Sequence, residues 1–324
     1  MNHPYDSLTP DCVVDCLESI GFVCDLRLLA LNSYENRVYQ VGVEGAQPII
    51  MKFYRHGRWT DAQILEEHSF AQELVDHEIS VVAPMLVSDK TLHHAHGQRF
   101  SVFERRGGYP PELDNPDHLY RLGQTLGRIH RIGRAKPFLH RRDISSKRMA
   151  TESRVFLEEQ AVPRELMNAY STLAKDCEQT AASLLSTMTK RDMQRVHGDC
   201  HTGNILWRDD TPHFVDLDDC VSGPAIQDIW MFLSGDRFQQ ERQLSEFVSG
   251  YEEFHEFDSR QLAWIEALRT LRIMHHAFWL ASRWDDPAFP RAFPWFGQAR
   301  FWSDHILELR EQLGLMQEPT LRLL

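Results

Sequence analysis

The run from residue 197 to residue 219 constrains this chain more than any other part of its sequence. It contains Asp199, then Asn204 five positions later, and Asp216 after two short apolar segments. The residues between those segments, Arg-Asp-Asp-Thr-Pro, are typical of a turn. A tight hairpin in this place brings the three polar side chains together. The fold must therefore present them at one point, beside buried strands.

The residue types and their spacing favour phosphoryl transfer to a hydroxyl group. That reaction needs a carboxylate to orient and deprotonate the acceptor, and oxygen ligands for a Mg²⁺ ion that bridges the phosphates. Asp199 and Asn204 have the spacing of the base and the metal-binding asparagine in the kinase pattern H-R-D-x-x-x-x-N. This resemblance to the kinase pattern implies that Asp199 is the catalytic base and that Asn204 and Asp216 are metal ligands. Asp218 and Asp219 are accessory candidates.

Two other interpretations of the run stay open at this point. The carboxylates could simply cap and turn a polar loop, as single aspartates often do. His197, Asp199 and His201 could instead form a transition-metal site of a hydrolase. The second alternative leaves Asn204 and the downstream aspartates unexplained, and these suit hard Mg²⁺ better than zinc.

The first third of the chain predicts an antiparallel meander that supplies the other groups a kinase needs. Strands are expected over 26–31, 37–43 and 48–54, and a helix over 60–76 begins at the N-cap Thr60. Lys52 lies in an apolar strand and is expected to hold the α and β phosphates of ATP. A buried lysine needs an acidic partner. Glu66 and Glu67 in the helix offer one, and the family resemblance given below favours Glu67.

A nucleotide-covering loop is expected between the first two strands. The chain has no G-x-G-x-x-G motif there, but Ser33 and Asn36 are small and polar and offer donors to phosphate oxygens. The last strand of this part ends at Phe103 and Glu104, where we expect the adenine to bind. These four residues, with Lys52 and Glu67, complete the predicted nucleotide site.

A change in composition divides the chain near residue 104. Gly107-Gly108 with Pro110-Pro111 is typical of a hinge, and helical periodicity dominates after it. We expect a small lobe over 1–104 that covers the nucleotide, and a helical lobe over 105–324 with the catalytic loop. The remaining predicted elements are a helix over 9–20, strands over 84–88, 98–103, 205–207 and 213–217, and helices over 118–132, 164–185, 225–233, 242–254, 259–284 and 301–313.

Charge and composition limit the possible partners. The net charge is −12, from 35 basic and 47 acidic residues, so the overall field repels nucleic acid and anionic membranes. No apolar run has the length of about 18 residues that a membrane span needs. The six cysteines form no C-x-x-C pair. We expect a cytoplasmic monomer with reduced thiols.

The same motifs resemble the aminoglycoside phosphotransferase and choline kinase superfamily. Its HGD-x-x-x-x-N motif matches residues 197–204, its acidic motif matches 214–219, and its G-P-x-x-x-D segment matches 223–228. The resemblance implies a two-lobed, protein-kinase-like α+β fold with a small antiparallel lobe, and it implies ATP and Mg²⁺. It also implies that His197 supports the loop and that Asp228 accepts backbone N–H bonds from it.

Over nearly its full length the chain is similar to a group of bacterial stress response kinases within that superfamily. Characteristic phrases are LNSYENRVYQ, HGDCHTGNILWRD, GPAIQDIWM and DPAFPRAFPWF. This resemblance implies transfer of phosphate to serine or threonine of proteins, including self-phosphorylation. The sequence indicates no catalytic role for the last phrase, at 286–296. A small-molecule kinase with an aminoglycoside, choline or homoserine-like acceptor, and an inactive nucleotide-binding scaffold, are the alternatives.

Overall fold

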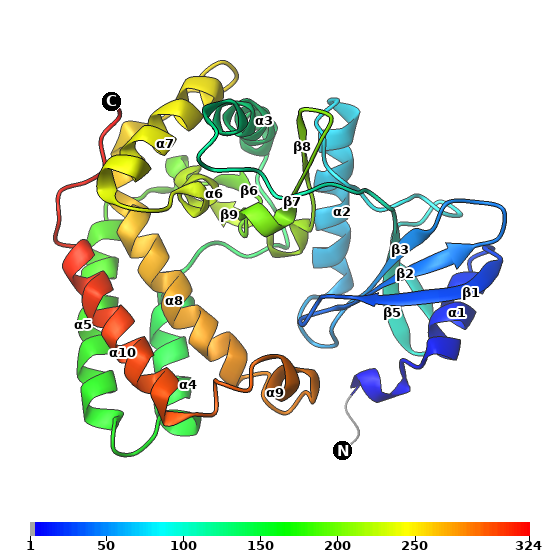
Figure 1. Cartoon of the computed structure of the whole chain (residues 1–324), viewed down its shortest axis with the longest axis horizontal. Coiled ribbons are helices and arrows are strands. Elements are labelled where there is room, and N and C mark those ends of the chain that lie inside the picture. The colour runs from blue at the N-terminus through cyan, green and yellow to red at the C-terminus, as the bar shows by residue number, and fades with distance from the viewer. Residues whose placement is uncertain (1–3) are drawn as a thin grey trace.

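The computed structural model describes residues 4–324 and shows a β-rich part and a larger helical part (Figure 1). The β-rich part is one five-stranded antiparallel sheet in the order β1-β2-β3-β5-β4. Its strands are β1 (Cys24–Leu31), β2 (Arg37–Val43), β3 (Ile49–Phe53), β4 (His93–Ala95) and β5 (Gln98–Glu104). The predicted α+β fold with a small antiparallel lobe is confirmed.

The sheet has two different faces because side chains alternate along its strands. One face packs on helix α1 (Pro10–Glu18) through a buried apolar cluster that includes Val41, Met51 and Val102. Lys52 lies on the other face, where it pairs in register with Val38 and Ser101. The register of the sheet therefore directs the predicted nucleotide lysine away from the small core.

Two helices of this part begin at the caps that the sequence indicates. The Thr9 hydroxyl accepts the N–H of Cys12 and begins α1. Thr60 forms a reciprocal capping box with Gln63 and begins α2 (Asp61–Asp76). The inner face of α2, with Phe70 and Leu74, belongs to the large core of the helical part. Helix α2 thus joins the sheet to the rest of the molecule.

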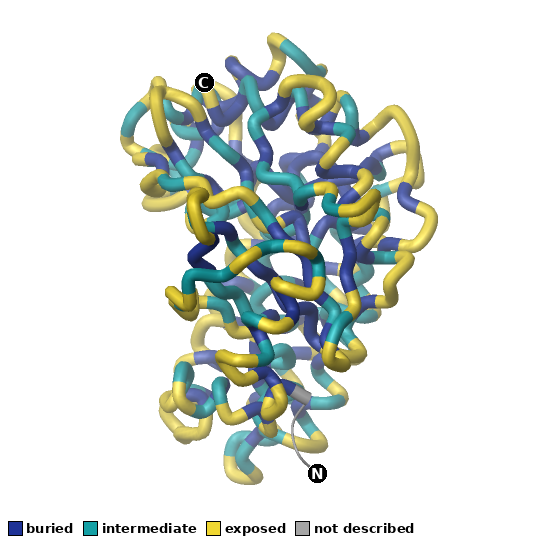
Figure 2. The backbone as a smooth tube through the Cα atoms, turned by 90° about the vertical axis from the view of Figure 1, so that its right-hand side faces the viewer, coloured by how far each residue is buried: buried dark blue, intermediate teal, exposed yellow. Residues whose placement is uncertain are grey.

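The helical part packs its long helices around one large apolar core, and buried backbone is concentrated in its interior (Figure 2). Two small two-stranded sheets are set into it. Its strands are β6 (Gln194–Val196), β7 (Ile205–Arg208), β8 (Thr211–Phe214) and β9 (Val221–Gly223). Its helices are α3 (Pro116–Ala135), a π-helix (Lys147–Glu152), α4 (Ser153–Gln160), α5 (Met167–Leu185), α6 (Ile226–Ile229), α7 (Arg237–Tyr251), α8 (Ile265–Ala281), α9 (Ala288–Ala292) and α10 (Ala299–Leu315).

The predicted strand over 84–88 is wrong. Only isolated bridges form there, because Pro84 lacks an N–H and because Ser88 and Asp89 turn the chain with positive φ. The neighbour of β5 is β4 instead, in a hairpin with His96 and Gly97 at its turn. The predictions also missed the helical stretch 147–160 and helix α9.

The predicted strand over 213–217 ends earlier, at Phe214. Asp216 has φ 58° and ψ 61°, a left-handed conformation that no strand continues through. Leu217–Asp219 then form a short 3-10 helix. The backbone therefore bends sharply at the predicted metal ligand.

Among the helices of residues 4–324, none combines the length and the apolar character that a membrane crossing requires.

Candidate active site

The loop at 197–204, called the catalytic loop below, is held by one buried carboxylate. Asp228 Oδ2 accepts the backbone N–H of His197 at 2.7 Å, and Asp228 Oδ1 accepts that of Gly198 at 2.8 Å. His130 Nε2 lies 3.0 Å from the same carboxylate, and both side chains are fully buried. The prediction that Asp228 accepts backbone N–H bonds from the loop is confirmed.

Two further contacts fix the shape of the catalytic loop. The ring of His197 donates from Nε2 to the Val215 carbonyl at 2.9 Å, which ties the loop to the strand that leads to Asp216. Gly198 has φ 85°, and a Cβ at this position would collide with the Asp219 carbonyl. The predicted supporting role of His197 is confirmed, and a glycine is required next to it.

The catalytic loop presents Asp199 to an arginine that the sequence did not single out. Arg272 of α8 places Nη1 2.5 Å from Asp199 Oδ1, and His201 Nε2 lies 3.5 Å from Oδ2. Burial alone raises the pKa of Asp199, but the contacts with His201 and Arg272 outweigh it and hold this pKa well below its usual range. Asp199 is thus an ionised carboxylate with 23% of its side chain exposed.

Lys52 and Asp216 join the two parts of the molecule. Lys52 Nζ lies 2.7 Å from Asp216 Oδ1 and 3.3 Å from Asp218 Oδ1. Glu67 Oε1 is farther, at 4.0 Å, while Glu66 binds backbone N–H groups at 139–141. Burial lowers the pKa of Lys52, but the two aspartates outweigh it and raise this pKa above its usual value. The structure thus places Glu67, and not Glu66, beside a charged lysine.

Asp218 is the buried centre of a larger charge network. Its side chain is 3% exposed and contacts Arg58, and it accepts Asn36 Nδ2 at 3.0 Å. Arg58 also places Nη2 2.5 Å from Asp219 Oδ1. Arg141 donates to the Asp218 carbonyl and, at 2.9 Å, to that of Cys220. Asp218 therefore holds together the charged residues at the bottom of the site.

Asn204 and Asp216 offer oxygen ligands that suit Mg²⁺. Asn204 donates Nδ2 to the Asp199 carbonyl at 2.9 Å, an orientation that leaves its Oδ1 for a ligand. The Asp216 side chain is 53% exposed, so it can reach a metal bound with nucleotide. No group of three or more His, Cys, Asp or Glu side chains in residues 4–324 is arranged to hold a metal ion. An ion held by Asn204 and Asp216 would need its other ligands from phosphate and water, which Mg²⁺ commonly uses.

The hydrolase alternative finds no matching geometry. The His197 ring is occupied by the Val215 carbonyl, and the His201 ring accepts the N–H of Gly203 at 3.0 Å. The two rings thus serve the fold of the loop, each with its own partner.

The sheet offers an apolar surface next to Lys52. Val38, Leu31, Ile50 and Phe103 share the Lys52 face by register, and none of them is fully buried. Glu104 ends β5 and is exposed. Apart from Phe103, the sequence analysis missed these side chains, although the alternation of the strands could have indicated them.

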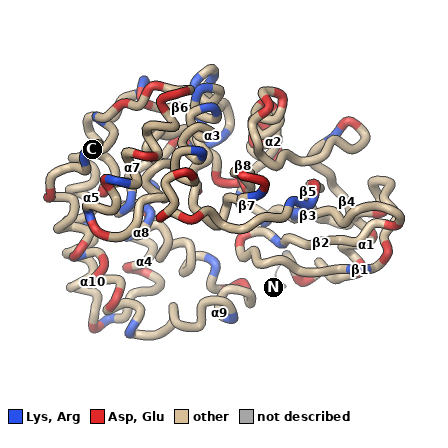
Figure 3. The backbone as a smooth tube through the Cα atoms, turned by 45° about the horizontal axis from the view of Figure 1, so that its top comes forward, with Lys and Arg blue, Asp and Glu red and all other residues tan. Residues whose placement is uncertain are grey.

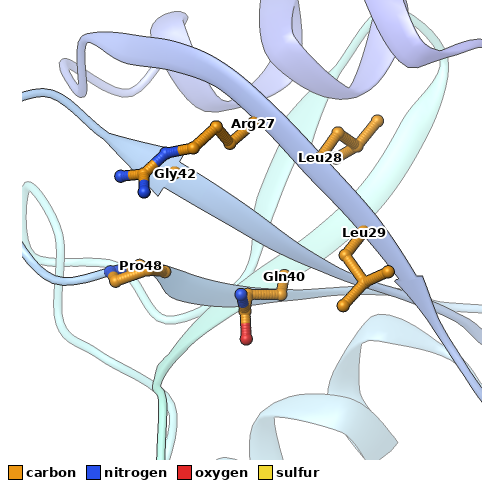
Figure 4. Close-up of a pocket in the computed structure, with 6 residues that line it drawn as sticks. All are labelled: Arg27, Leu28, Leu29, Gln40, Gly42 and Pro48. Carbon is orange, nitrogen blue, oxygen red and sulfur yellow. The ribbon is translucent and has the colours of Figure 1, made fainter.

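A separate hollow of about 110 Å³ lies at the far end of β1 and β2 (Figure 4). Leu29 and Gln40 contribute to it, together with Arg27. The Leu29–Gln40 pair lies two residues along the strands from the Leu31–Val38 pair, so this hollow is displaced from Lys52 along β1 and β2.

The loop between β1 and β2, residues 32–36, is held by side chains of the helical part. Glu35 accepts Trp279 Nε1 at 2.5 Å and pairs with Arg283 at 3.3 Å. Tyr34 packs edge-on against Phe293 with ring centroids 4.8 Å apart. Ser33 is half-buried in the same loop. The predicted nucleotide-covering loop is therefore fixed across the two parts of the molecule.

Asp286 explains the segment 286–296, which had no role in the sequence. Its carboxylate is 1% exposed and pairs with Arg37 at 2.8 Å and with Arg55 at 2.5 Å. It also accepts the N–H of Ala288 at 3.0 Å, which starts α9. We call these contacts of Glu35 and Asp286 the clasp. The segment thus holds the β-rich part against the end of α8.

Comparison with known proteins agrees with this geometry. The phosphotransferase enzyme family matches residues 27–306. The chain is 43% identical to stress response kinase A of Escherichia coli O157:H7, over 98% of this chain and 97% of the relative. It is 42% identical to the serine/threonine protein kinase RdoA of Salmonella typhimurium, with the same coverage.

A solved structure shares the fold. Amicoumacin kinase hAmiN, determined with AMP-PNP, Ca²⁺ and Ami, superposes with a TM-score of 0.73 and covers 93% of this chain and 92% of its own. The two sequences are 22% identical. The arrangement of a small sheet on a helical lobe is therefore shared across a wide range of sequence.

Proposed function

Because this chain belongs to the phosphotransferase enzyme family, we propose that it is a serine/threonine protein kinase that uses ATP and Mg²⁺. One observation carries the proposal. Lys52 of the sheet reaches Asp216 at 2.7 Å, beside an anchored loop that presents Asp199 and Asn204. The groups that hold phosphates, hold metal and accept a proton thus meet between the two parts.

The nucleotide is proposed to lie on the Lys52 face of the sheet. Phe103 and its apolar neighbours would contact adenine, and the backbone near Glu104 would bind its edge. Lys52 would neutralise the phosphates, with Glu67 as its buried second partner. Ser33 would donate from the covering loop, and Asn36 would act through Asp218, to which it is bonded.

The transfer step follows from the remaining groups. The acceptor hydroxyl gives its proton to the Asp199 carboxylate while its oxygen attacks the γ-phosphorus. The bond from that phosphorus to the oxygen bridging to the β-phosphate breaks, and ADP leaves. When bound at Asn204 and Asp216, Mg²⁺ would supply charge neutralisation for the phosphates. The catalytic loop keeps Asp199 ionised for this task.

The acceptor is proposed from the names of the relatives. The relative from Salmonella typhimurium is named a serine/threonine protein kinase, and those from Escherichia coli are named stress response kinases. The high coverage of both chains supports a role of the same kind, with self-phosphorylation and a part in stress responses.

The test is to incubate the purified chain with γ-labelled ATP and Mg²⁺, alone, with a protein mixture, and with choline or an aminoglycoside. We expect label on serine or threonine of protein. Label on the small molecules alone would assign a small-molecule kinase. Nucleotide binding without any transfer would support a scaffold and contradict the proposal.

A further inference from the structure

Arg272 covers the carboxylate that an acceptor hydroxyl must reach. Its Nη1 lies 2.5 Å from Asp199 Oδ1, while 42% of the Arg272 side chain stays exposed. The acceptor donates its proton to that same carboxylate, so it has to approach beside this guanidinium. The chemistry around Arg272 therefore selects what can bind next to Asp199.

Further arginines lie near the part of α8 that follows Arg272. His275, one turn after Arg272, places Nδ1 3.2 Å from Ser153 Oγ, and Ser153 Oγ lies 3.3 Å from the Arg148 carbonyl. Burial and then the nearby arginines, Arg148 among them, lower the pKa of His275 to about 3. The π-helix with Arg148 is thus joined directly to the helix that carries Arg272.

Arg142 and Arg148 have no carboxylate partner within ion-pair distance among residues 4–324. Arg142 is exposed, with its guanidinium 5.1 Å from the centre of the Trp59 ring. Burial and the Arg142 charge lower the pKa of Arg148, while Asp219 and Glu152 oppose this effect. Arg148 is therefore within electrostatic range of Arg142 and of Asp219.

Arg142, Arg148 and Arg272 form what we call the basic acceptor surface. A hollow of about 280 Å³ between the loop after β3 and the end of α8 lies outside this surface, because its arginines are paired with carboxylates.

This surface differs from the molecule as a whole. The net charge is −12, and acidic and basic segments are mixed over the entire backbone (Figure 3). Arg272 beside Asp199, together with the unpaired Arg142 and Arg148, would repel a cationic amino alcohol or aminoglycoside and attract an anion. Arginine also binds carboxylates and phosphates in a bidentate manner.

We infer that the acceptor is a serine or threonine flanked by acidic or phosphorylated residues of a protein, bound by the basic acceptor surface. This inference rests on the proposed protein kinase function. An acidic side chain of the acceptor takes the place of Asp199 as the partner of Arg272. Asp199 is then free to accept the hydroxyl proton, so binding of the right acceptor also prepares the base.

The test compares serine peptides that differ only in the flanks: aspartate and glutamate, asparagine and glutamine, lysine, or one phosphoserine. The full chain is used with ATP and Mg²⁺. We expect kcat/KM about tenfold higher for the acidic and phosphorylated peptides than for the amide peptide, and lowest for the lysine peptide. The double variant R142Q/R148Q should raise KM for the acidic peptide about tenfold, about threefold for each arginine, with little change in kcat or in KM for ATP.

Two controls separate charge from structure. R148K keeps the charge and should retain the preference, and R300Q removes an arginine of α10 whose side chain is 87% exposed and should change nothing. Equal kcat/KM on all peptides, or an unchanged preference in the double variant, overturns the inference while leaving the kinase function intact. Transfer only to small molecules, or no transfer at all, overturns both.

Discussion

The catalytic loop and the loop at 32–36 both border the space beside Lys52, but they are held in different ways. The catalytic loop is fixed through its own backbone, which donates two N–H groups to the buried Asp228. The loop at 32–36 is fixed through long side chains, with Glu35 bonded to Trp279 of α8 and to Arg283 just after that helix. The first arrangement fixes the position of Asp199, the proposed base. The second fixes how the two parts of the molecule face each other.

This difference has a physical consequence for motion. Backbone bonds to a fully buried carboxylate open only when the surrounding core opens. The Glu35 contacts of the clasp lie nearer the solvent, with 12% of the Glu35 side chain and 25% of the Arg283 side chain exposed, so they open at lower cost than the backbone bonds. We therefore expect the catalytic loop to stay rigid while the loop at 32–36 opens and closes over ATP.

The largest expected effect on stability belongs to Asp228→Asn. An amide group turns one acceptor into a donor that faces the N–H of His197 or Gly198, in a fully buried site. We expect a loss of about 3 kcal/mol in the free energy of unfolding, measured by urea denaturation.

Asp236→Asn is the matched control for that change. Asp236 caps α7 at the surface, and asparagine caps helices as well as aspartate does. If both variants lost a similar amount of unfolding free energy, the Asp228 bonds to the loop backbone would be no stronger than an ordinary helix cap.

Lys52→Met tests the group that connects the two parts. Without its charge, Asp216 loses a partner at 2.7 Å and the nucleotide phosphates lose a cation. We expect kcat/KM for ATP to fall by at least about a hundredfold, measured by steady-state phosphate transfer.

Lys136→Met provides the comparison for Lys52, since Lys136 pairs with Glu73 and is 57% exposed. It should leave kcat/KM within about twofold of the original, as expected for an exposed pair. Full activity of Lys52→Met would remove Lys52 from the nucleotide site.

Asp286→Asn tests the clasp. Arg37 and Arg55 lose their shared carboxylate, so the loop at 32–36 loses part of its support from the helical part. We expect KM for ATP to rise about fivefold with kcat nearly unchanged, together with a loss of about 2 kcal/mol in stability.

The neighbouring Asp285→Asn is exposed and serves as the control. Hydrogen exchange of residues 32–36 should increase in Asp286→Asn and stay the same in Asp285→Asn. An unchanged loop in both would mean that the clasp does not hold it.

A smaller effect concerns pH and the connection between α2 and the sheet. His68 of α2 contacts the Tyr54 hydroxyl at 2.7 Å, and burial with the Lys52 charge lowers the pKa of His68 to about 3. The unfolded chain, with a histidine pKa of about 6.5, binds this proton more readily. The contribution of neutral His68 is therefore complete above about pH 6.5 and is lost as pH falls toward 3.

His68→Gln should remove that dependence. When the pH falls from 7 to 5, the free energy of unfolding of the original chain should decrease by about 2 kcal/mol more than that of the variant. Identical pH profiles would show that His68 takes up its proton in the folded protein. Urea denaturation at the two pH values decides between these outcomes.

The sequence predicted the parts of the site whose signal is local. The spacing of Asp199, Asn204 and Asp216 indicated the catalytic loop, and the apolar surroundings of Lys52 indicated its strand. The capping pattern at Thr60 placed the start of α2 correctly. In each case the neighbours along the chain determine the structure.

The parts that the sequence did not reveal depend on partners far away in the chain. Arg272 is one of two arginines in α8, and only the fold places it on Asp199. Asp286 lies 231 residues from Arg55, and no periodicity links the two. The left-handed backbone at Asp216 was missed because an apolar alternation continues through it.

Single-turnover phosphate transfer by Asp199→Asn tests the account most directly. The variant and the original chain are each mixed with labelled ATP, Mg²⁺ and a protein acceptor, and nucleotide binding is measured in parallel. The account predicts unchanged nucleotide affinity and a transfer rate lower by about a thousandfold, because the base is lost and its supporting loop is kept. Transfer at the original rate would contradict the assignment of Asp199 and the mechanism built on it.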